Sequence, residues 1–111
     1  MNGLKNSILL IGNLGRDPET KTLESGRAFA RFTMATSESY RNANGDKVTS
    51  TQWHNIVAWG KTAEVAGNLL KKGKEVAVRG KLTYRNYKDK EGIDRSIPEV
   101  VVDEFALLSK P

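Results

Sequence analysis

The chain has 111 residues, and we expect residues 1–111 to form a single domain with one modest hydrophobic core. It contains no cysteine, which excludes disulfides, thiolate metal sites and thiol nucleophiles. Its formal net charge of +5 favours a polyanionic partner, although many domains of other functions are also basic.

The N-terminal region shows no sign of a targeting or membrane segment. Residues 1–5 do not open an apolar stretch followed by a small-residue cleavage site, as a secretory signal would. The longest apolar run, Ile8 to Ile11, is far shorter than the roughly 20 residues of a membrane helix. We therefore expect a cytoplasmic protein that does not enter a membrane.

The same apolar run lies in the first predicted strand, residues 6–14. Alternate residues of a strand point to opposite faces, so this strand is apolar on both of them. A domain with one core buries only one face, and the other is covered by inserted elements or by another subunit. We favour self-association, with Ile8 and Leu10 at the subunit interface.

Most of the remaining chain also predicts strands. Residues 28–36 alternate with period two, and Asn44-Gly45 is a strong hairpin signal within a projecting loop expected at 37–50. Further strands are predicted at 51–60, 74–87 and 95–108, with a short piece at 21–23 and a hairpin turn at 89–92.

One helix is predicted, over residues 62–72. Apolar residues recur there at helical spacing, and Gly73 is suited to a left-handed C-terminal cap. Long strands with one helix between the third and fourth are typical of an all-β architecture, the five-stranded, partly open Greek-key barrel of the oligonucleotide-binding fold (OB-fold). An immunoglobulin-like sandwich would have more and shorter strands and no central helix.

Two predicted strands combine aromatic and cationic side chains. Trp53 and Trp59 share one face of their strand, while Arg79, Arg85 and Tyr87 share a face of the next. Residues 71–90 contain eight lysines and arginines against two acids. An unpaired nucleic acid needs flat rings for its bases and cations for its phosphates, so this pattern favours single-strand binding. The alternatives are core tryptophans and an ordinary solvated strand face. For Tyr84, which shares a face with Leu82, we expect a place in the core.

Several segments resemble the bacterial single-stranded DNA-binding protein family. They are residues 11–19, 35–40, 52–54, 72–73, 78–82, 94–95 and 99–102, and the resemblance covers residues 4 to about 108. It implies a homotetramer of oligonucleotide-binding barrels that binds single-stranded DNA without sequence preference, in replication, recombination and repair. It also implies association with the nucleoid.

The resemblance also implies roles for particular residues. The stacking aromatics would be Tyr40, Trp53, Trp59 and Tyr87, of which Tyr40 and Tyr87 are commonly Trp in the family and Trp59 is commonly Phe. His54 would lie at a subunit contact. The candidates for phosphate contacts are Lys61, Lys72, Arg79, Arg85 and Lys88.

The chain departs from the family at its C-terminal end. Family members usually continue into a flexible tail with an acidic tip that recruits replication and repair proteins, whereas this sequence stops at Ser109-Lys110-Pro111. Recruitment through such a tip is therefore in doubt. DNA binding does not depend on it.

An enzyme is not expected, and neither a metal nor a cofactor is implied. His54 is the only histidine, no nucleophile-elbow motif is present, and Gly12 to Gly15 lacks the spacing of a phosphate-binding loop.

Two alternative binding functions stay open. A primosome-type relative would act mainly through protein partners, but it would be expected to lack some of the four aromatics. An RNA- or oligosaccharide-binding barrel is the other. A cationic face disfavours sugars, whereas stacking and phosphate contacts do not discriminate RNA.

Overall fold

The computed structural model describes residues 5–109, so the predictions made for residues 1–4 and for the last two residues of the chain lie outside it. The described part contains six strands and one helix. Their bounds are β1 (Ile8–Leu14), β2 (Glu19–Thr22), β3 (Ala28–Arg41), β4 (Lys47–Trp59), α1 (Gly60–Leu69), β5 (Glu75–Lys88) and β6 (Asp94–Leu107).

Five of the strands form a closed barrel in the order β1-β5-β6-β4-β3. The ring closes where β1 pairs with β3, through Asn13 opposite Ala35 and Leu14 opposite Met34. The short strand β2 adds to the outside edge of β3. The predicted five-stranded barrel with one helix is therefore confirmed.

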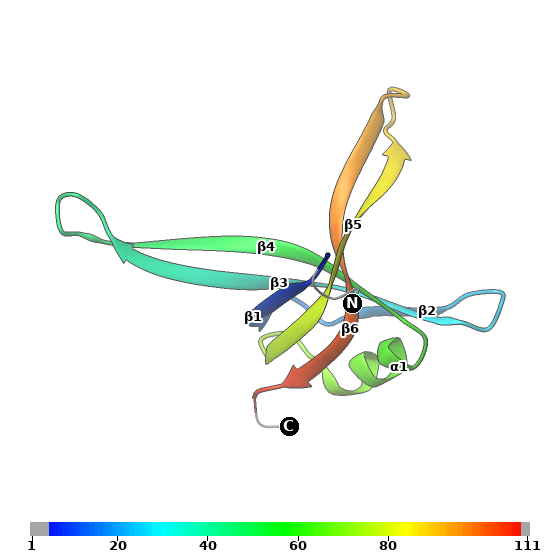
Figure 1. The fold of residues 1–111 in the computed structure, drawn as a ribbon. Coiled ribbons are helices and arrows are strands. Elements are labelled where there is room, and N and C mark those ends of the chain that lie inside the picture. The colour runs from blue at the N-terminus through cyan, green and yellow to red at the C-terminus, as the bar shows by residue number, and fades with distance from the viewer. Residues whose placement is uncertain (1–4, 110–111) are drawn as a thin grey trace.

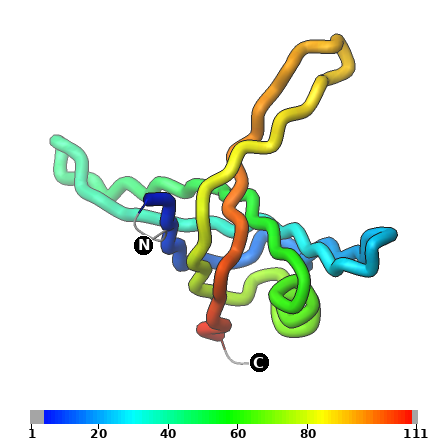
Figure 2. Tube along the Cα trace, turned by 45° about the vertical axis from the view of Figure 1, so that its right-hand side comes forward, coloured from blue at the N-terminus to red at the C-terminus, as the bar shows by residue number. Residues whose placement is uncertain are grey.

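Three hairpins project from the barrel, as Figure 1 shows for β3–β4 on the left, β5–β6 at the top and β2–β3 on the right. Figure 2 shows the same arms from a second direction. The radius of gyration is 16.1 Å, above the roughly 13 Å expected for a compact domain of this length. The arms therefore carry a substantial part of the chain away from the core.

The β3–β4 arm is more regular than the sequence predicts. A projecting hairpin loop is predicted at residues 37–50, and the hairpin is present, but β3 and β4 stay paired much further, out to Arg41 opposite Lys47. Hydroxyl pairs such as Ser39 with Thr49, at 3.2 Å, cross the ribbon. Polar residues on both faces are typical of a loop, but they equally suit a two-stranded ribbon that is solvated on both sides.

Helix α1 begins and ends earlier than the predicted range of 62–72. It spans Gly60–Leu69, and Leu70 leaves it in an extended conformation with its side chain fully buried. Gly73 does adopt the left-handed conformation, with φ of 86°, but it does so in the turn that precedes β5. Burial of Leu70 ends the helix before the expected cap.

The core lies inside the barrel, and α1 contributes Ala63 and Ala66 to it. The main barrel residues of this core are Leu14, Ala30, Phe32, Met34, Ile56, Ala58, Val76, Val78, Val100 and Val102. Two glycines permit the strands to approach. A Cβ at Gly12 would lie 2.0 Å from the Ala35 carbonyl oxygen, and one at Gly80 would lie 2.1 Å from that of Val101.

Candidate nucleic-acid interface

A groove of about 450 Å³ is lined by residues of the β2–β3 and β5–β6 arms and of the end of β4. Aromatic, cationic and polar side chains from five strands line it. They are Lys21, Leu23, Phe29, Arg31, Val57, Trp59, Thr83, Tyr84, Arg85, Glu99 and Val101. The groove is therefore the place where flat rings and cations from different arms meet.

Trp59 is half-buried in the wall of this groove. Its ring centroid lies 4.7 Å from that of Phe29, and the two ring planes are tilted by 60°. The guanidinium of Arg27 lies 4.8 Å from the centre of the Trp59 ring. The tryptophan is thus held by an aromatic neighbour and capped by a cation, an arrangement that π systems favour.

Trp53 lies further out along β4 and is 62% exposed. Its six-residue separation from Trp59 places both side chains on the same face of the strand, about 20 Å apart along it. The ring lies close to Gly15, where an added Cβ would be 2.6 Å from the Cζ3 atom of Trp53. This tryptophan is an exposed platform resting on the turn after β1.

The two predicted tyrosine platforms lie elsewhere. Tyr40 is 56% exposed but pairs with Val48, and strand alternation places it on the face of the β3–β4 arm opposite Trp53. Tyr87 is 40% exposed on the β5–β6 arm, with the guanidinium of Arg85 5.8 Å from its ring centre. The four aromatics are all accessible in part, but they do not form one continuous face.

Tyr84 corrects a prediction. It was expected in the core because it shares a strand face with Leu82, yet it is 63% exposed and lines the groove. Tyr84 does lie on the same strand face as Leu82, but at this residue β5 has already projected beyond the barrel, so that face no longer covers the core.

Of the five cations predicted to contact phosphates, Arg85 lines the groove. Lys88 lies at the outer end of β5, where its Nζ is 2.8 Å from Asp94. Arg79 pairs with Glu104 at 3.0 Å and lines a separate hollow beside Leu9. Lys72 follows α1, and its backbone N–H donates to Asp17.

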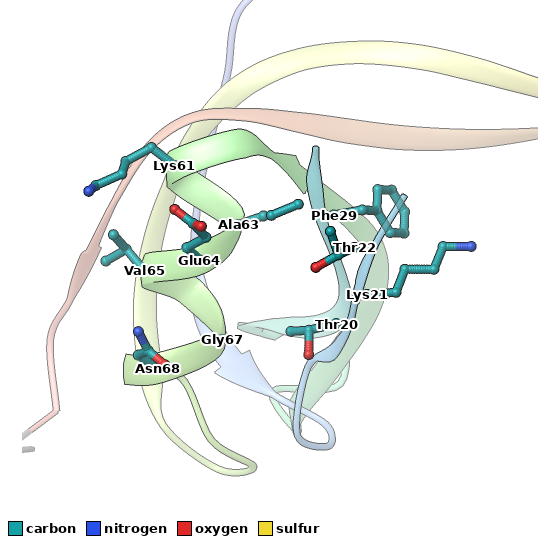
Figure 3. A pocket seen from close by; sticks show the side chains of 11 residues that line it. Thr20, Lys21, Thr22, Phe29, Lys61, Ala63, Glu64, Val65, Gly67 and Asn68 are labelled. Atoms are coloured by element: carbon teal, nitrogen blue, oxygen red, sulfur yellow. The ribbon is translucent and has the colours of Figure 1, made fainter. Parts of the chain in front are cut away.

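Lys61 lies in the first turn of α1, at the rim of a pocket between α1 and β2. Figure 3 shows that the side chains of Lys61 and Lys21 point outward on opposite sides of this pocket, away from each other. Gly67 permits a close approach of the helix here, since an added Cβ would be 2.9 Å from Cγ2 of Thr20. The cations do not converge, so this pocket is a weaker candidate than the groove.

Sequence reasoning missed two charged groove residues, Arg31 and Glu99. Arg31 lies on β3 directly opposite Val57, and its guanidinium is 5.1 Å from the Phe29 ring centre. Glu99 lies on β6 and is buried. The period-two pattern of 28–36 placed Arg31 on the outward face, which was the available signal. Glu99 begins one of the segments that resemble the family, but its sequence neighbours give no sign that it contacts Arg31 and Arg85.

The three residues predicted at a subunit interface, Ile8, Leu10 and His54, lie on β1 and β4. Ile8 and Leu10 are half-buried and pack against the core, whereas Leu9 and Ile11 are 67% and 53% exposed. His54 is half-buried, and its Nε2 lies 2.9 Å from the Thr36 hydroxyl. It lies on the strand face opposite Trp53, as the spacing predicts.

Within residues 5–109, no group of three or more His, Cys, Asp or Glu side chains is arranged to hold a metal ion. The described residues also contain no helix with the length and hydropathy of a membrane span.

A closed five-stranded barrel with a groove of aromatic and cationic side chains defines an oligonucleotide-binding barrel. Comparison with known families makes this specific: the model of the single-strand binding protein family matches residues 5–108. The chain belongs to this family. It is a family of binding proteins, which agrees with the expectation that the chain is not an enzyme.

Individual relatives agree with this assignment. Single-stranded DNA-binding proteins from Neisseria meningitidis serogroups A and B are each 44% identical over 103 residues, or 93% of this chain. The matched region makes up 59% of the length of those relatives.

Solved structures show the same fold. A Plasmodium falciparum SSB in complex with ssDNA has a TM-score of 0.85 and 29% identity, covering 94% of this chain and 95% of that one. A deletion mutant of the Thermus aquaticus single-stranded DNA-binding protein has a TM-score of 0.82 and 26% identity, covering 94% of this chain and 50% of that one.

Proposed function

We propose that this chain binds and protects single-stranded DNA without sequence preference, in replication, recombination and repair. The observation that carries the proposal is the groove, which brings Trp59, Arg31 and Arg85 together from three strands. Family membership and the similarity to an SSB complex with ssDNA support it.

Binding combines base stacking with phosphate contacts, and a duplex does not expose its base faces for the first of these. Every base has a flat face, and stacking on an aromatic side chain contributes about 1–3 kcal/mol per base. Trp53, Trp59, Tyr40 and Tyr87 supply the rings, and the arginines of the groove neutralise phosphates. The bases contribute through their faces, which explains why sequence is not read.

The direct test is the affinity of Trp53→Ala for poly-dT. We expect it to fall about tenfold to a hundredfold if one base stacks on this ring. Leu69→Ala is the matched control, because Leu69 is also an exposed apolar residue but lies on α1, outside both the groove and the strand that carries Trp53 and Trp59. Unchanged affinity in a folded Trp53→Ala variant would remove Trp53 from the interface.

The electrostatic part has a separate test. The logarithm of the affinity should fall linearly with the logarithm of the salt concentration. The slope of this plot (the salt slope) should have a magnitude of about 0.7 for each phosphate contacted on a single strand. An affinity that does not change with salt contradicts the role of Arg31 and Arg85.

We also propose that the chain forms homo-oligomers, a tetramer by resemblance to its family. Leu9 and Ile11 on β1 are exposed, and Leu9 shares a surface hollow with Ala77 and Ala106, beside the Arg79–Glu104 ion pair. An exposed apolar surface of this kind is typical of a contact between subunits. Ile8 and Leu10 support it from beneath by fixing the strand on the core.

Leu9→Glu should dissociate the oligomer by placing a charge at the packed contact, whereas Leu69→Glu on α1 should not. Mass photometry at nanomolar protein concentration measures both. Intact tetramers of Leu9→Glu would contradict this surface.

A further inference from the structure

Glu99 is the one charged residue among residues 5–109 that is buried, at 6% exposure, and it lines the groove proposed to hold a polyanion. A carboxylate there repels phosphates, and burial removes its hydration. Attraction of DNA therefore does not explain its presence.

The contacts of Glu99 provide a reason. Its Oε2 lies 3.2 Å from Nε of Arg85 and 3.7 Å from Nη2 of Arg31. Arg85 comes from β5, Arg31 from β3 and Glu99 from β6, so one carboxylate connects residues from both sides of the groove. The three together carry a net charge of +1.

The same contacts leave part of each guanidinium available. Arg85 uses its Nε on Glu99, so neither of its terminal nitrogens is used in that contact, and its side chain is 44% exposed. Arg31 is 40% exposed, while its Nε is buried and has no hydrogen-bond partner. Glu99 therefore holds Arg85 through its Nε and Arg31 through a longer ion pair to its Nη2, while both side chains stay partly exposed.

We propose, resting on the function above, that Glu99 is a positioning residue that holds Arg31 and Arg85 in the orientation in which they meet phosphates. Long side chains lose rotamer freedom when they bind, and fixing them beforehand reduces that loss. The planar guanidinium suits this role because one edge can bind the carboxylate while the other faces the ligand.

The test compares two substitutions that each remove one negative charge from β6. Glu99→Gln removes the charge inside the groove, and Asp103→Asn removes it from an exposed residue outside the groove. If Glu99 positions the arginines, Glu99→Gln weakens poly-dT binding by about threefold to tenfold and lowers the salt slope by about 0.7 for each lost phosphate contact. Asp103→Asn leaves binding equal to or slightly tighter than that of the wild type.

The affinity of Glu99→Gln can also contradict the proposal. If Glu99→Gln binds as tightly as the wild type or more tightly, the carboxylate does not position the arginines and the inference is wrong. Failure of the wild type to bind poly-dT would instead overturn the proposed function itself.

Arg85→Lys provides a second variant should Glu99→Gln fail to fold. It keeps the charge but loses the second edge of the guanidinium, so it is expected to bind more weakly with a smaller salt slope. Wild-type affinity and slope in Arg85→Lys would also overturn the inference.

Discussion

The indole ring of Trp53 lies against the backbone of Gly15, so closely that an added Cβ would be 2.6 Å from Cζ3 and 3.0 Å from Cη2 of the ring. Trp53 is nevertheless 62% exposed. The turn after β1 therefore supports the ring on one side while most of the ring stays accessible to a base. Gly15 therefore belongs to the proposed interface through its support of Trp53.

Gly15→Ala should move this ring without unfolding the barrel. The atoms that the new methyl meets belong chiefly to the outer end of a surface side chain, which can shift. We expect a stability change below about 1 kcal/mol, with poly-dT affinity about threefold to tenfold lower. Tryptophan emission and thermal melting measure the two effects. Unchanged emission and affinity would show that Gly15 does not set the position of Trp53.

Gly12→Ala, unlike Gly15→Ala, should destabilise the barrel. The same methyl, placed three residues earlier, meets the carbonyl of Ala35 at 2.0 Å, where β1 and β3 close the barrel. Backbone cannot move aside as a side chain does, so we expect about 1–3 kcal/mol of destabilisation. Urea unfolding of the two variants side by side is the measurement. Equal stabilities would contradict the closure described here.

Tyr40 should contribute only with longer ligands. It lies on the face of the β3–β4 arm opposite Trp53, beyond it toward the tip. Tyr40→Ala should therefore leave the affinity for a short oligo-dT unchanged and weaken binding of poly-dT by about 1–3 kcal/mol for a stacked base. Fluorescence anisotropy with oligonucleotides of increasing length tests this. A loss that is the same at every length would place Tyr40 on the same path as Trp53.

The tip of the β5–β6 arm should loosen in acid. The N–H of Ile93, then the guanidinium of Arg95 and the N–H of Glu91, hold the pKa of Asp89 below its usual value of 3.8. The folded tip thus favours the charged carboxylate. Its stabilisation is complete above pH 3.8 and is lost as the pH falls through the lower folded pKa.

Amide hydrogen exchange of residues 89–93 across that pH range measures the loss. Asp89→Asn is the control, since it keeps the side-chain oxygen of the turn but does not titrate. An identical acid transition in Asp89→Asn would mean that another group is responsible.

The sequence predicted the barrel and its helix because hydrophobic alternation and turn residues report on local structure. It predicted less well where a strand leaves the barrel. Tyr84 continues the alternation of Val78 and Leu82, but the arm beyond the barrel has no core to face. Alternation gives the side of a strand and does not say what covers that side.

The first strand shows a second limit. With four consecutive apolar residues, the pattern does not say which pair points inward. Pairing of β1 with β5 decides it, since Leu10 opposes the buried Val78 while Leu9 opposes the exposed Arg79. Likewise, the contact of Glu99 with Arg31 and Arg85 joins β6, β3 and β5, and no local pattern reports such a contact.

The most direct test of the central claim is a titration that follows intrinsic tryptophan fluorescence while poly-dT is added, at two salt concentrations, with poly-U and duplex DNA as comparisons. Stacking on Trp53 or Trp59 predicts strong quenching by poly-dT, none by duplex, and a midpoint that shifts with salt. Weaker quenching by poly-U would show a preference for DNA over RNA. No quenching and no binding of poly-dT in low salt would contradict the account.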